Sequence, residues 1–379
     1  MGLHILVLAG GSGTRLWPLS RASVPKHLLP IGPGGATLLR TTVERVIDLG
    51  DTVNIVTAQS QVELTLRALD GLTDSVGIIA EPDARGTGPA LGLATRWVAA
   101  DDPDAVLVSV HADAAIDDRE GYRAAVVAAA GWACTASGLA TVGLQPTTPA
   151  TGLGYIALGE IRDQSRWAPA GSATSGPVAE AAARTDAFSA QGFVEKPPLA
   201  TAQQFVADGT HLWNLGLFAW PAAVFERELR AADPQLADAL AAIVISRRSG
   251  DESGAAAAYR ALTPVAIEPL VFERTANLTV VRATFGWSDL GSWSDLLGSR
   301  RAGGEGDDDG NVIDGDVLLV DSTSCWVSSR GGRLVAVAGA NNLVVVDTGD
   351  AVLVVPATEA QAVKDVVDRL RADGRGDLL

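Results

Sequence analysis

The sequence is poor in several residue types whose abundance marks particular classes of protein. Its two cysteines, Cys134 and Cys325, lie far apart and match no metal-ligand spacing, which argues against a disulfide scaffold and a zinc site. Only three residues are lysine, and 29 basic residues face 45 acidic ones, which gives a net charge of −16. Because binding to a nucleic acid polymer requires a basic surface, we expect no such partner.

Long hydrophobic runs are also missing. Residues 124–144 carry no charge, but they are mostly Ala, Gly, Ser and Thr, so they predict a helix followed by a buried strand and not a membrane span. Residues 1–7 lack the basic segment that opens a signal peptide. With 47% hydrophobic residues, the chain can still build a sizeable core. We therefore expect a globular, cytoplasmic protein without a membrane segment.

The first 110 residues alternate short apolar runs with segments of helical spacing. This alternation predicts an α/β fold, with a mainly parallel sheet and helices on both faces. Ligands of such folds bind where loops leave the carboxyl ends of the strands. The predicted strands are residues 3–8, 53–58, 76–80 and 105–110, and the helical spacing covers residues 39–47 and 91–98.

The composition changes after residue 301. Residues 302–311 are rich in Gly and Asp, and short β-type runs separated by turn residues follow them, with a helical pattern at 359–370. A chain of 379 residues is also too long for one ordinary domain. We expect a larger domain at 1–301 and a small β-rich domain with a closing helix at 311–379. Residues 167–178 predict a flexible surface loop.

The strongest local signal is the glycine-rich segment after the first predicted strand. Glycines at positions 10, 11 and 13 let the backbone turn with its N–H groups exposed, which favours phosphate binding. Arg15 supplies a forked cation, and Lys26, after Pro25, supplies a point charge. Leu16 breaks the dinucleotide fingerprint, and no GK[ST] completes a Walker A loop. The alternative is a tight strand–helix turn with a surface arginine.

This segment, G-G-x-G-x-R-L-x-P-L followed by P-K, resembles the signature of the sugar-1-phosphate nucleotidyltransferases. The form with Trp17 and Ser20–Arg21 is most similar to the mannose-1-phosphate guanylyltransferases. The resemblance implies a Rossmann-like, mixed and mainly parallel sheet, followed by the family's C-terminal β domain. Further family motifs appear in order within residues 3–293, at Glu81–Pro82, Arg85–Ala90, Asp113, Thr151–Ile156, Phe193–Pro197, Trp213–Phe218 and Trp287–Trp293.

The resemblance also implies a reaction and assigns residues to it. GMP would pass from GTP to mannose 1-phosphate, giving GDP-mannose and pyrophosphate, with Mg²⁺ as cofactor; a homodimer is compatible with the extra β domain. Arg15, Lys26 and Lys196 would be catalytic, and Asp113 and Asp289 would bind the metal. The resemblance assigns nucleotide contacts to Leu8, Gly10, Gly11, Gly13, Thr14, Glu81, Arg85, Thr87 and Gly88, and sugar-phosphate contacts to Gly154, Tyr155, Glu195, Lys196 and Asn214.

Several of these residues have a purely structural interpretation. Asp113 could cap a helix, as could Asp117 or Asp118, and Asp289 could stabilise a turn. Tyr155 could be a core tyrosine of a β-hairpin. Glu195 and Lys196 could form an ion pair at the end of a strand. Their side chains should point to opposite faces, unless the two prolines that follow distort the strand end. Residues 85–89 could be a helix N-terminus, and His27, His111 and His211 could lie at the surface or at a pocket rim.

The chain departs from the family pattern at positions that recognise the base and the sugar. His111–Ala114, Ala84–Pro89, Leu215 and His27 differ from the family's usual residues. The nucleotide and the sugar are therefore more open than the reaction type. The alternatives are thymidylyl, uridylyl or adenylyl transfer, or a non-catalytic regulatory relative that binds nucleotide sugars. The broken glycine spacing disfavours an NAD-dependent oxidoreductase.

Overall fold

The computed structural model describes residues 1–11, 13–171 and 175–379. Ser12 of the glycine loop and residues 172–174 of the loop predicted at 167–178 lie outside them. Contacts divide the chain into two compact units, and the domain limits predicted from the sequence stay a prediction. Unit 1 comprises Met1–Gly10, Val43–His111 and Asp118–Phe285, and unit 2 comprises Gly11–Thr42, Ala112–Asp117 and Gly286–Leu379.

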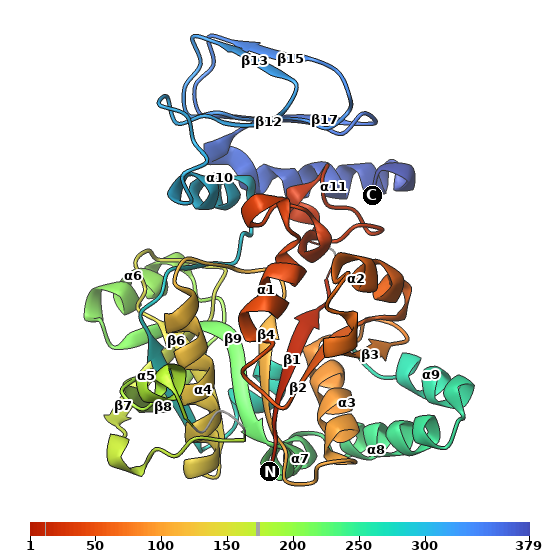
Figure 1. Ribbon diagram of the computed structural model, residues 1–379, viewed down its shortest axis with the longest axis vertical. Helices are drawn as coiled ribbons and strands as arrows, with labels where there is room; N and C mark the ends of the chain where they lie inside the picture. Colours follow the sequence, from red (N-terminus) through yellow and green to blue (C-terminus); the bar gives the residue numbers. More distant parts are fainter. Residues whose placement is uncertain (12, 172–174) are drawn as a thin grey trace. The chain divides into compact units, whose positions relative to one another are not determined.

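Unit 1 is built on one mixed sheet, whose order over the described residues is β3-β2-β1-β4-β9-β6-β10-β8-β7 (Figure 1). The first four strands of the chain run parallel, and β9 is antiparallel to both of its main neighbours, β4 and β6. The predicted α/β fold and its early strands are confirmed. The strands are β1 (Leu3–Ala9), β2 (Thr52–Ala58), β3 (Gly77–Glu81), β4 (Val106–His111), β6 (Leu139–Leu144), β7 (Tyr155–Ile161), β8 (Ala187–Val194), β9 (His211–Pro221) and β10 (Leu278–Ala283).

The strand order reverses between β1 and β4. From β1 the chain moves outward through β2 to β3, and it then returns to place β4 on the other side of β1. Doubly wound sheets bind ligands outside the carboxyl ends of the strands at such a switch point. Here those ends are Ala9, which leads into the glycine loop, and His111, which leads to Asp113.

Helices cover the sheet of unit 1 and bury its apolar side chains. Leu6 and Leu8 of β1 pack in one core with α3, α7 and α8. The uncharged stretch at 124–144 forms the end of α4 and all of β6, as predicted, and over the described residues no helix is long and apolar enough to cross a membrane. The division between the units falls within α1 (Leu38–Val46), with residues 38–42 in unit 2 and residues 43–46 in unit 1. The helices of unit 1 are α2 (Val62–Ala68), α3 (Thr87–Ala99), α4 (Arg119–Thr135), α5 (Pro177–Ala182), α6 (Leu199–Asp208), α7 (Ala222–Ala232), α8 (Pro234–Arg248) and α9 (Glu252–Arg260).

Unit 2 contains a short β pair and a coil of parallel strands. β5 (Ala115–Ile116) pairs with β11 (Trp287–Ser288), and α10 (Trp293–Ala302) follows. Beyond α10 the chain forms two small sheets, β12-β14-β16-β17 and β13-β15, in which all pairs except β16–β17 are parallel, and α11 (Val363–Ala372) follows them (Figure 1). This confirms the predicted C-terminal β domain. The strands are β12 (Val312–Gly315), β13 (Val317–Val320), β14 (Trp326–Ser329), β15 (Val335–Ala338), β16 (Leu343–Asp347) and β17 (Val352–Pro356).

One hydrophobic core joins the early and late segments of unit 2. Leu16 and Trp17, from the segment that follows the glycines, pack with Trp293 of α10 and with Val363 and Val367 of α11. Burying such side chains contributes roughly 1.5–3 kcal/mol each. The segment that carries the glycines is therefore anchored to the C-terminal strands and helices of the same unit.

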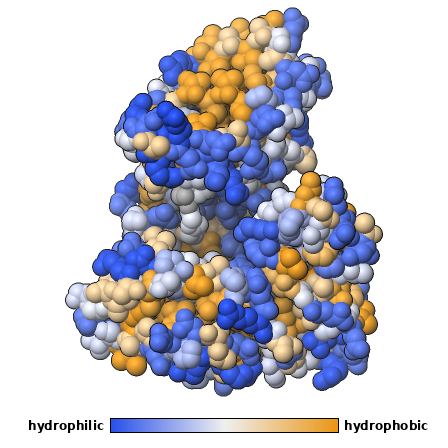
Figure 2. All heavy atoms as spheres, turned by 180° about the vertical axis from the view of Figure 1, so that it is seen from behind, coloured by the Kyte–Doolittle hydropathy of each residue, from blue (hydrophilic) through white to orange (hydrophobic). Residues whose placement is uncertain are grey.

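Unit 2 also exposes apolar side chains. Leu318 and Val320 of β13, and Val352 and Val354 of β17, are about half exposed. Figure 2 shows apolar atoms gathered over these C-terminal strands. Patches of this kind are common at interaction surfaces. The homodimer stays a prediction.

Candidate active site

The glycine loop packs directly against Lys26. Gly13 has a left-handed backbone (φ 57°), and a Cβ built on it would lie 2.4 Å from the Cβ of Lys26, so a side chain at this position would displace the lysine. The Ser20 hydroxyl donates to the Gly13 carbonyl at 2.6 Å and holds the loop in this position. A Cβ on Gly10 or Gly11 would meet no atom within 4 Å, so the other side of the loop is open.

Arg15 lies in a short 3₁₀ turn, Thr14–Leu16, directly after the loop. Its side chain is exposed and has no hydrogen bond or ion pair within the described part of the chain. An unpaired guanidinium beside glycine amides is free to bind an anion such as a phosphate.

Lys26 is the centre of a charged cluster in unit 2. Only 7% of the residue is exposed, and its ammonium lies 2.7 Å from an Asp113 carboxylate oxygen and also donates to the Asp289 main-chain carbonyl. The pairing of Ser288 with Ala115 in the β11–β5 sheet brings the two aspartates to adjacent positions. The structure therefore brings together Lys26 and both predicted metal ligands.

Asp289 has an unfavourable environment for its negative charge. Surrounding protein atoms raise the pKa of its carboxyl above the ordinary value, Lys26 opposes this shift, and Asp295 and Asp113 add to it. The carboxylate nevertheless reaches the surface, and it accepts a hydrogen bond from Gly291 N at 3.2 Å. An added cation would relieve the repulsion between these acids.

His27 is buried, so the expectation that it lies at the surface or a pocket rim is wrong. Burial lowers its pKa to about 4, with Asp113 opposing the shift, so the imidazole is neutral at pH 7. Its Nε2 has no hydrogen-bond partner among the described residues. No pattern in the sequence indicated this burial.

A second cluster, in unit 1, contains Glu195 and Lys196. β8 ends at Val194, and Lys196 has a left-handed backbone (φ 47°), so the alternation expected of a strand does not continue through the pair. The two side chains instead form an ion pair at 2.7 Å, and 63% of the Lys196 side chain is exposed. The ion pair given as the structural alternative is present, and its cation is accessible to a ligand.

Strand register places Gly154 and Asn214 beside Glu195. A Cβ on Gly154 would lie 2.6 Å from a Glu195 carboxylate oxygen, and Asn214 N donates to the Gly154 carbonyl at 2.8 Å. The Asn214 side-chain oxygen accepts bonds from Thr141 Oγ1 and Gly216 N, both at 3.2 Å. Its amide N–H₂ therefore remains available as a donor.

The structure does not bring Tyr155 to this cluster. Tyr155 pairs with Val194 and Trp213, one residue away from Glu195 and Asn214, so its side chain lies on the opposite face of the sheet. It is fully buried, its ring packs near Phe205 of α6, and its hydroxyl donates to the Ala150 carbonyl at 3.0 Å. Tyr155 thus holds the loop that carries Gly154.

The predicted nucleotide residues of unit 1 are bound to other parts of that unit. Glu81 is buried at the end of β3 and accepts a hydrogen bond from Tyr259, and burial raises its pKa to about 7. No motif in the sequence pointed to Tyr259. Leu8 lies in the β1 core; Arg85 donates to the Arg260 carbonyl, Thr87 Oγ1 accepts from Ile267 N, and Gly88 N donates to the Val265 carbonyl.

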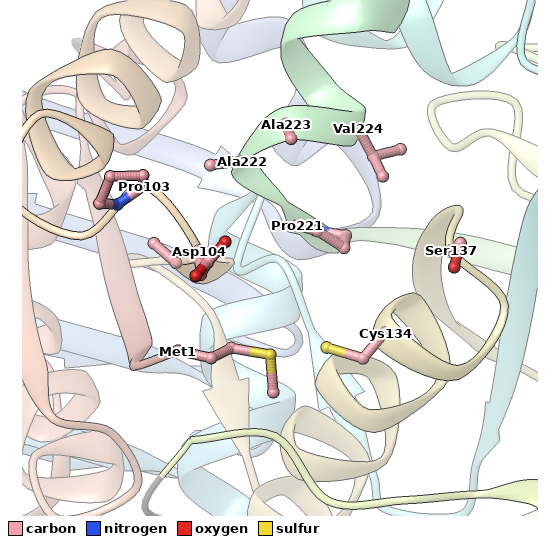
Figure 3. Close-up of a pocket in the computed structure, with 10 residues that line it drawn as sticks. Met1, Pro103, Asp104, Cys134, Ser137, Pro221, Ala222, Ala223 and Val224 are labelled. Carbon is pink, nitrogen blue, oxygen red and sulfur yellow. The ribbon is translucent and has the colours of Figure 1, made fainter.

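A cavity of about 360 Å³ in unit 1 contains none of the predicted site residues (Figure 3). It lies where β4 starts and β9 ends, whereas His111 and Asn214 lie toward the opposite ends of these two strands. Its lining comprises Met1, Pro103, Asp104, Ala105, Cys134, Ser137, Pro221, Ala222, Ala223 and Val224.

Comparison with known proteins gives the family. A family model described as nucleotidyl transferase matches residues 4–302, and one described as a MannoseP isomerase/GMP-like beta-helix domain matches residues 315–370. Mannose-1-phosphate guanylyltransferase of Escherichia coli (strain K12) is 37% identical over 389 residues, which cover 98% of this chain and 74% of that protein.

Two further proteins are similar over nearly the whole chain. The xanthan biosynthesis protein XanB of Xanthomonas campestris pv. campestris (strain B100) is 36% identical, with 98% of this chain and 74% of that protein covered. A crystal structure described as mannose-1-phosphate geranyltransferase from Thermus thermophilus is 31% identical, with a TM-score of 0.79, and covers 98% of this chain and 100% of that one. Together with the fold and the clustered motif residues, these matches show that the chain is an enzyme that belongs to the nucleotidyl transferase family.

Proposed function

We propose that this chain transfers GMP from GTP to mannose 1-phosphate, giving GDP-mannose and pyrophosphate. The observation that carries the proposal is the 37% identity, over 98% of the chain, to a protein named mannose-1-phosphate guanylyltransferase. The same substrates agree with the motif set that contains Trp17 and Ser20–Arg21.

The reaction is an in-line displacement at phosphorus. A phosphate oxygen of mannose 1-phosphate attacks the α-phosphorus of GTP, the bond from that phosphorus to the β-phosphate oxygen breaks, and pyrophosphate leaves with the electron pair. The attacking oxygen is already anionic, so no general base is required. Catalysis then depends on positioning the two anions and on compensating their charge.

The residues of unit 2 would bind the triphosphate. Lys26 is held in place by Asp113 and the Asp289 carbonyl before any substrate binds, so its charge need not be reoriented during the reaction. Arg15 would add a forked cation, and the amides of Gly11, Gly13 and Thr14 would bind phosphate oxygens.

Asp113 and Asp289 are a suitable donor set for Mg²⁺. Mg²⁺ is commonly held by one or two carboxylates and completes its shell with water and substrate phosphate oxygens. The described residues contain no group of three or more His, Cys, Asp or Glu residues that could hold a metal. The two aspartates would therefore bind the ion together with water and substrate oxygens. Mg²⁺ held by the two aspartates would supply positive charge to the α-phosphate.

The residues of unit 1 would bind the sugar phosphate. The ammonium of Lys196 is exposed and would exchange its contact with Glu195 for the phosphate of mannose 1-phosphate. Glu195 would then accept hydrogen bonds from sugar hydroxyls, and the free amide N–H₂ of Asn214 would donate one. Tyr155 would keep Gly154 and its loop in position.

A substrate panel tests the proposal. GTP, dTTP, UTP and ATP are each combined with mannose 1-phosphate and glucose 1-phosphate, and pyrophosphate release is measured with Mg²⁺ present. GTP with mannose 1-phosphate should give the highest kcat/KM. A higher value with another nucleotide would contradict guanylyl transfer, and nucleotide binding without any pyrophosphate release would indicate a regulatory relative.

A further inference from the structure

Two residues of the signature segment have no role in the mechanism above. Trp17 and Arg21 lie after the glycine loop, and neither belongs to the Lys26 cluster. Trp17 is buried in unit 2, and Arg21 is partly buried there. Their partners come from the other end of the chain.

Trp17 is bonded at both its side chain and its main chain. Its indole N–H donates to the Leu378 carbonyl at 2.8 Å, and its own carbonyl accepts the indole N–H of Trp293 at 3.1 Å. Its ring packs in the core that includes Val363 and Val367. The tail, defined here as residues 363–379, is therefore fixed to this tryptophan by both apolar contact and a hydrogen bond.

Arg21 connects the same segment to the tail and to the turn before β17. Its guanidinium donates to the carbonyls of Pro18 and Leu378 and to a carboxylate oxygen of Asp350 at 3.0 Å, and it lies over the Trp17 ring, 5.6 Å from the centroid. Only 12% of the side chain is exposed. A planar group with this many fixed partners defines one geometry for the backbone around it.

A short path leads from these contacts to the phosphate-binding groups. Ser20 lies between Trp17 and Arg21 in the sequence, and its hydroxyl holds the Gly13 carbonyl. Gly13 in turn packs against Lys26. The position of the glycine loop is thus set by a segment whose two ends are bonded to the tail.

We propose that the tail is a working part of the nucleotide site, and that Trp17 and Arg21 are positioning residues through which it holds the glycine loop and Lys26. The inference rests on the proposed function for the identity of the nucleotide. It also gives Trp17 and Arg21 of the signature a physical role, since both residues bind the C-terminal segment of this chain.

The alternative is that these contacts only stabilise unit 2. Arg300 offers a matched control, because 15% of its side chain is exposed, it pairs with Asp314 and Glu305, and it lies over the Trp326 ring at 5.0 Å. It resembles Arg21 in burial, ion pairing and ring contact, yet it does not bind the signature segment. A merely structural role predicts the same effect from both arginines.

The test compares Trp17→Phe, Arg21→Gln and Arg300→Gln. Trp17→Phe removes the N–H donor and part of the bicyclic ring but keeps an aromatic side chain in the core, so it remains informative if Arg21→Gln folds poorly. The measurements are the KM for each substrate, the Kd for GTP, and hydrogen exchange of the amides of residues 14–28. Trp17→Phe and Arg21→Gln should raise the KM and Kd for GTP by about tenfold and speed this exchange, with the KM for mannose 1-phosphate changed by less than about twofold.

Arg300→Gln should leave the GTP values and the exchange of residues 14–28 unchanged, even where it lowers the melting temperature. An equal rise in the GTP values with Arg300→Gln, or unchanged values with the other two variants, would overturn the inference. If the unmodified protein shows no turnover, the proposed function is wrong. The Kd for GTP and the exchange then decide the inference by the same criteria.

Discussion

The two lysines proposed to act on the substrates are held in contrasting ways. Lys26 in unit 2 is 7% exposed and has both a carboxylate and a carbonyl as partners, whereas the Lys196 side chain in unit 1 is 63% exposed and pairs with the adjacent Glu195. A buried, doubly bonded cation is fixed before substrate binds, while an exposed one can move. The difference indicates a rigid nucleotide side and an adaptable sugar-phosphate side.

The largest effect is expected at Lys26. Lys26→Ala removes a side-chain cation that pairs with Asp113, and it leaves Asp289 beside acids whose repulsion Lys26 had opposed. We expect kcat/KM to fall by about 1000-fold or more, since a preorganised charge at the reacting phosphates is lost. Arg330→Ala, at an exposed arginine of the same unit outside the tail, is the control and should leave the rate unchanged. A loss of less than about tenfold would contradict the role of Lys26.

Asp289→Asn tests the acidic half of the same cluster. The rate at saturating Mg²⁺ should fall by about 100-fold, and the Mg²⁺ concentration for half-maximal rate should rise, because one carboxylate donor is gone. The measurement is a Mg²⁺ titration of pyrophosphate release, with the exposed Asp308→Asn as control. Full activity with an unchanged Mg²⁺ dependence would exclude Asp289 as a metal ligand.

Lys196→Ala tests the adaptable side. The KM for mannose 1-phosphate should rise by about tenfold or more, while the KM for GTP stays constant. The melting temperature should not change, because an exposed ion pair contributes only about 0–1 kcal/mol. Steady-state kinetics with each substrate varied in turn checks this. Equal effects on both KM values would mean that the two lysines do not divide the substrates between them.

The smallest effect concerns a buried acid of unit 1. Burial raises the pKa of Glu81 from 4.5 to about 7, so between these values the folded protein holds a proton that the unfolded chain has released. This contribution to stability is complete below pH 4.5 and is lost as the pH rises through 7. Relative to Glu81→Gln, the unmodified protein should lose about 2 kcal/mol of unfolding free energy between pH 5 and pH 8.

Urea unfolding at the two pH values measures this difference. Glu252→Gln, at an exposed glutamate of α9, keeps Glu81, so it should lose the same stability as the unmodified protein and serves as the control. A Glu81→Gln variant that follows the unmodified protein at both pH values would show that Glu81 is ionised throughout.

Much of the fold could be predicted because the spacing of apolar residues along the sequence indicates which side chains are buried. The runs at 3–8 and 105–110 are apolar at nearly every position, as expected of strands covered on both faces, and the uncharged stretch at 124–144 lacked the large side chains of a membrane span. The coil of β12 to β17 showed no repeat in the sequence. Val312, Trp326 and Val344 pair in register on neighbouring strands, although the segments between them differ in length. The sequence therefore has no fixed repeat length that would predict this pairing.

The site could be predicted in its residue types but not in its local geometry. The sequence identified Lys26, Asp113 and Asp289, and the structure brings them together. It did not show that Tyr155 lies on the other face from Asn214, because that depends on the pairing of β7 with β8 and β9. Nor could it show that Lys196 turns back onto Glu195, since this requires the left-handed backbone found at that position.

The most direct test of the reaction itself follows the phosphorus atoms of GTP. With GTP labelled at the α-phosphorus and unlabelled mannose 1-phosphate, the label should appear in GDP-mannose, and with GTP labelled at the γ-phosphorus it should appear in pyrophosphate. Release of the γ label as inorganic phosphate, or of the α label in pyrophosphate, would contradict attack at the α-phosphorus and with it the roles given to Lys26 and Lys196.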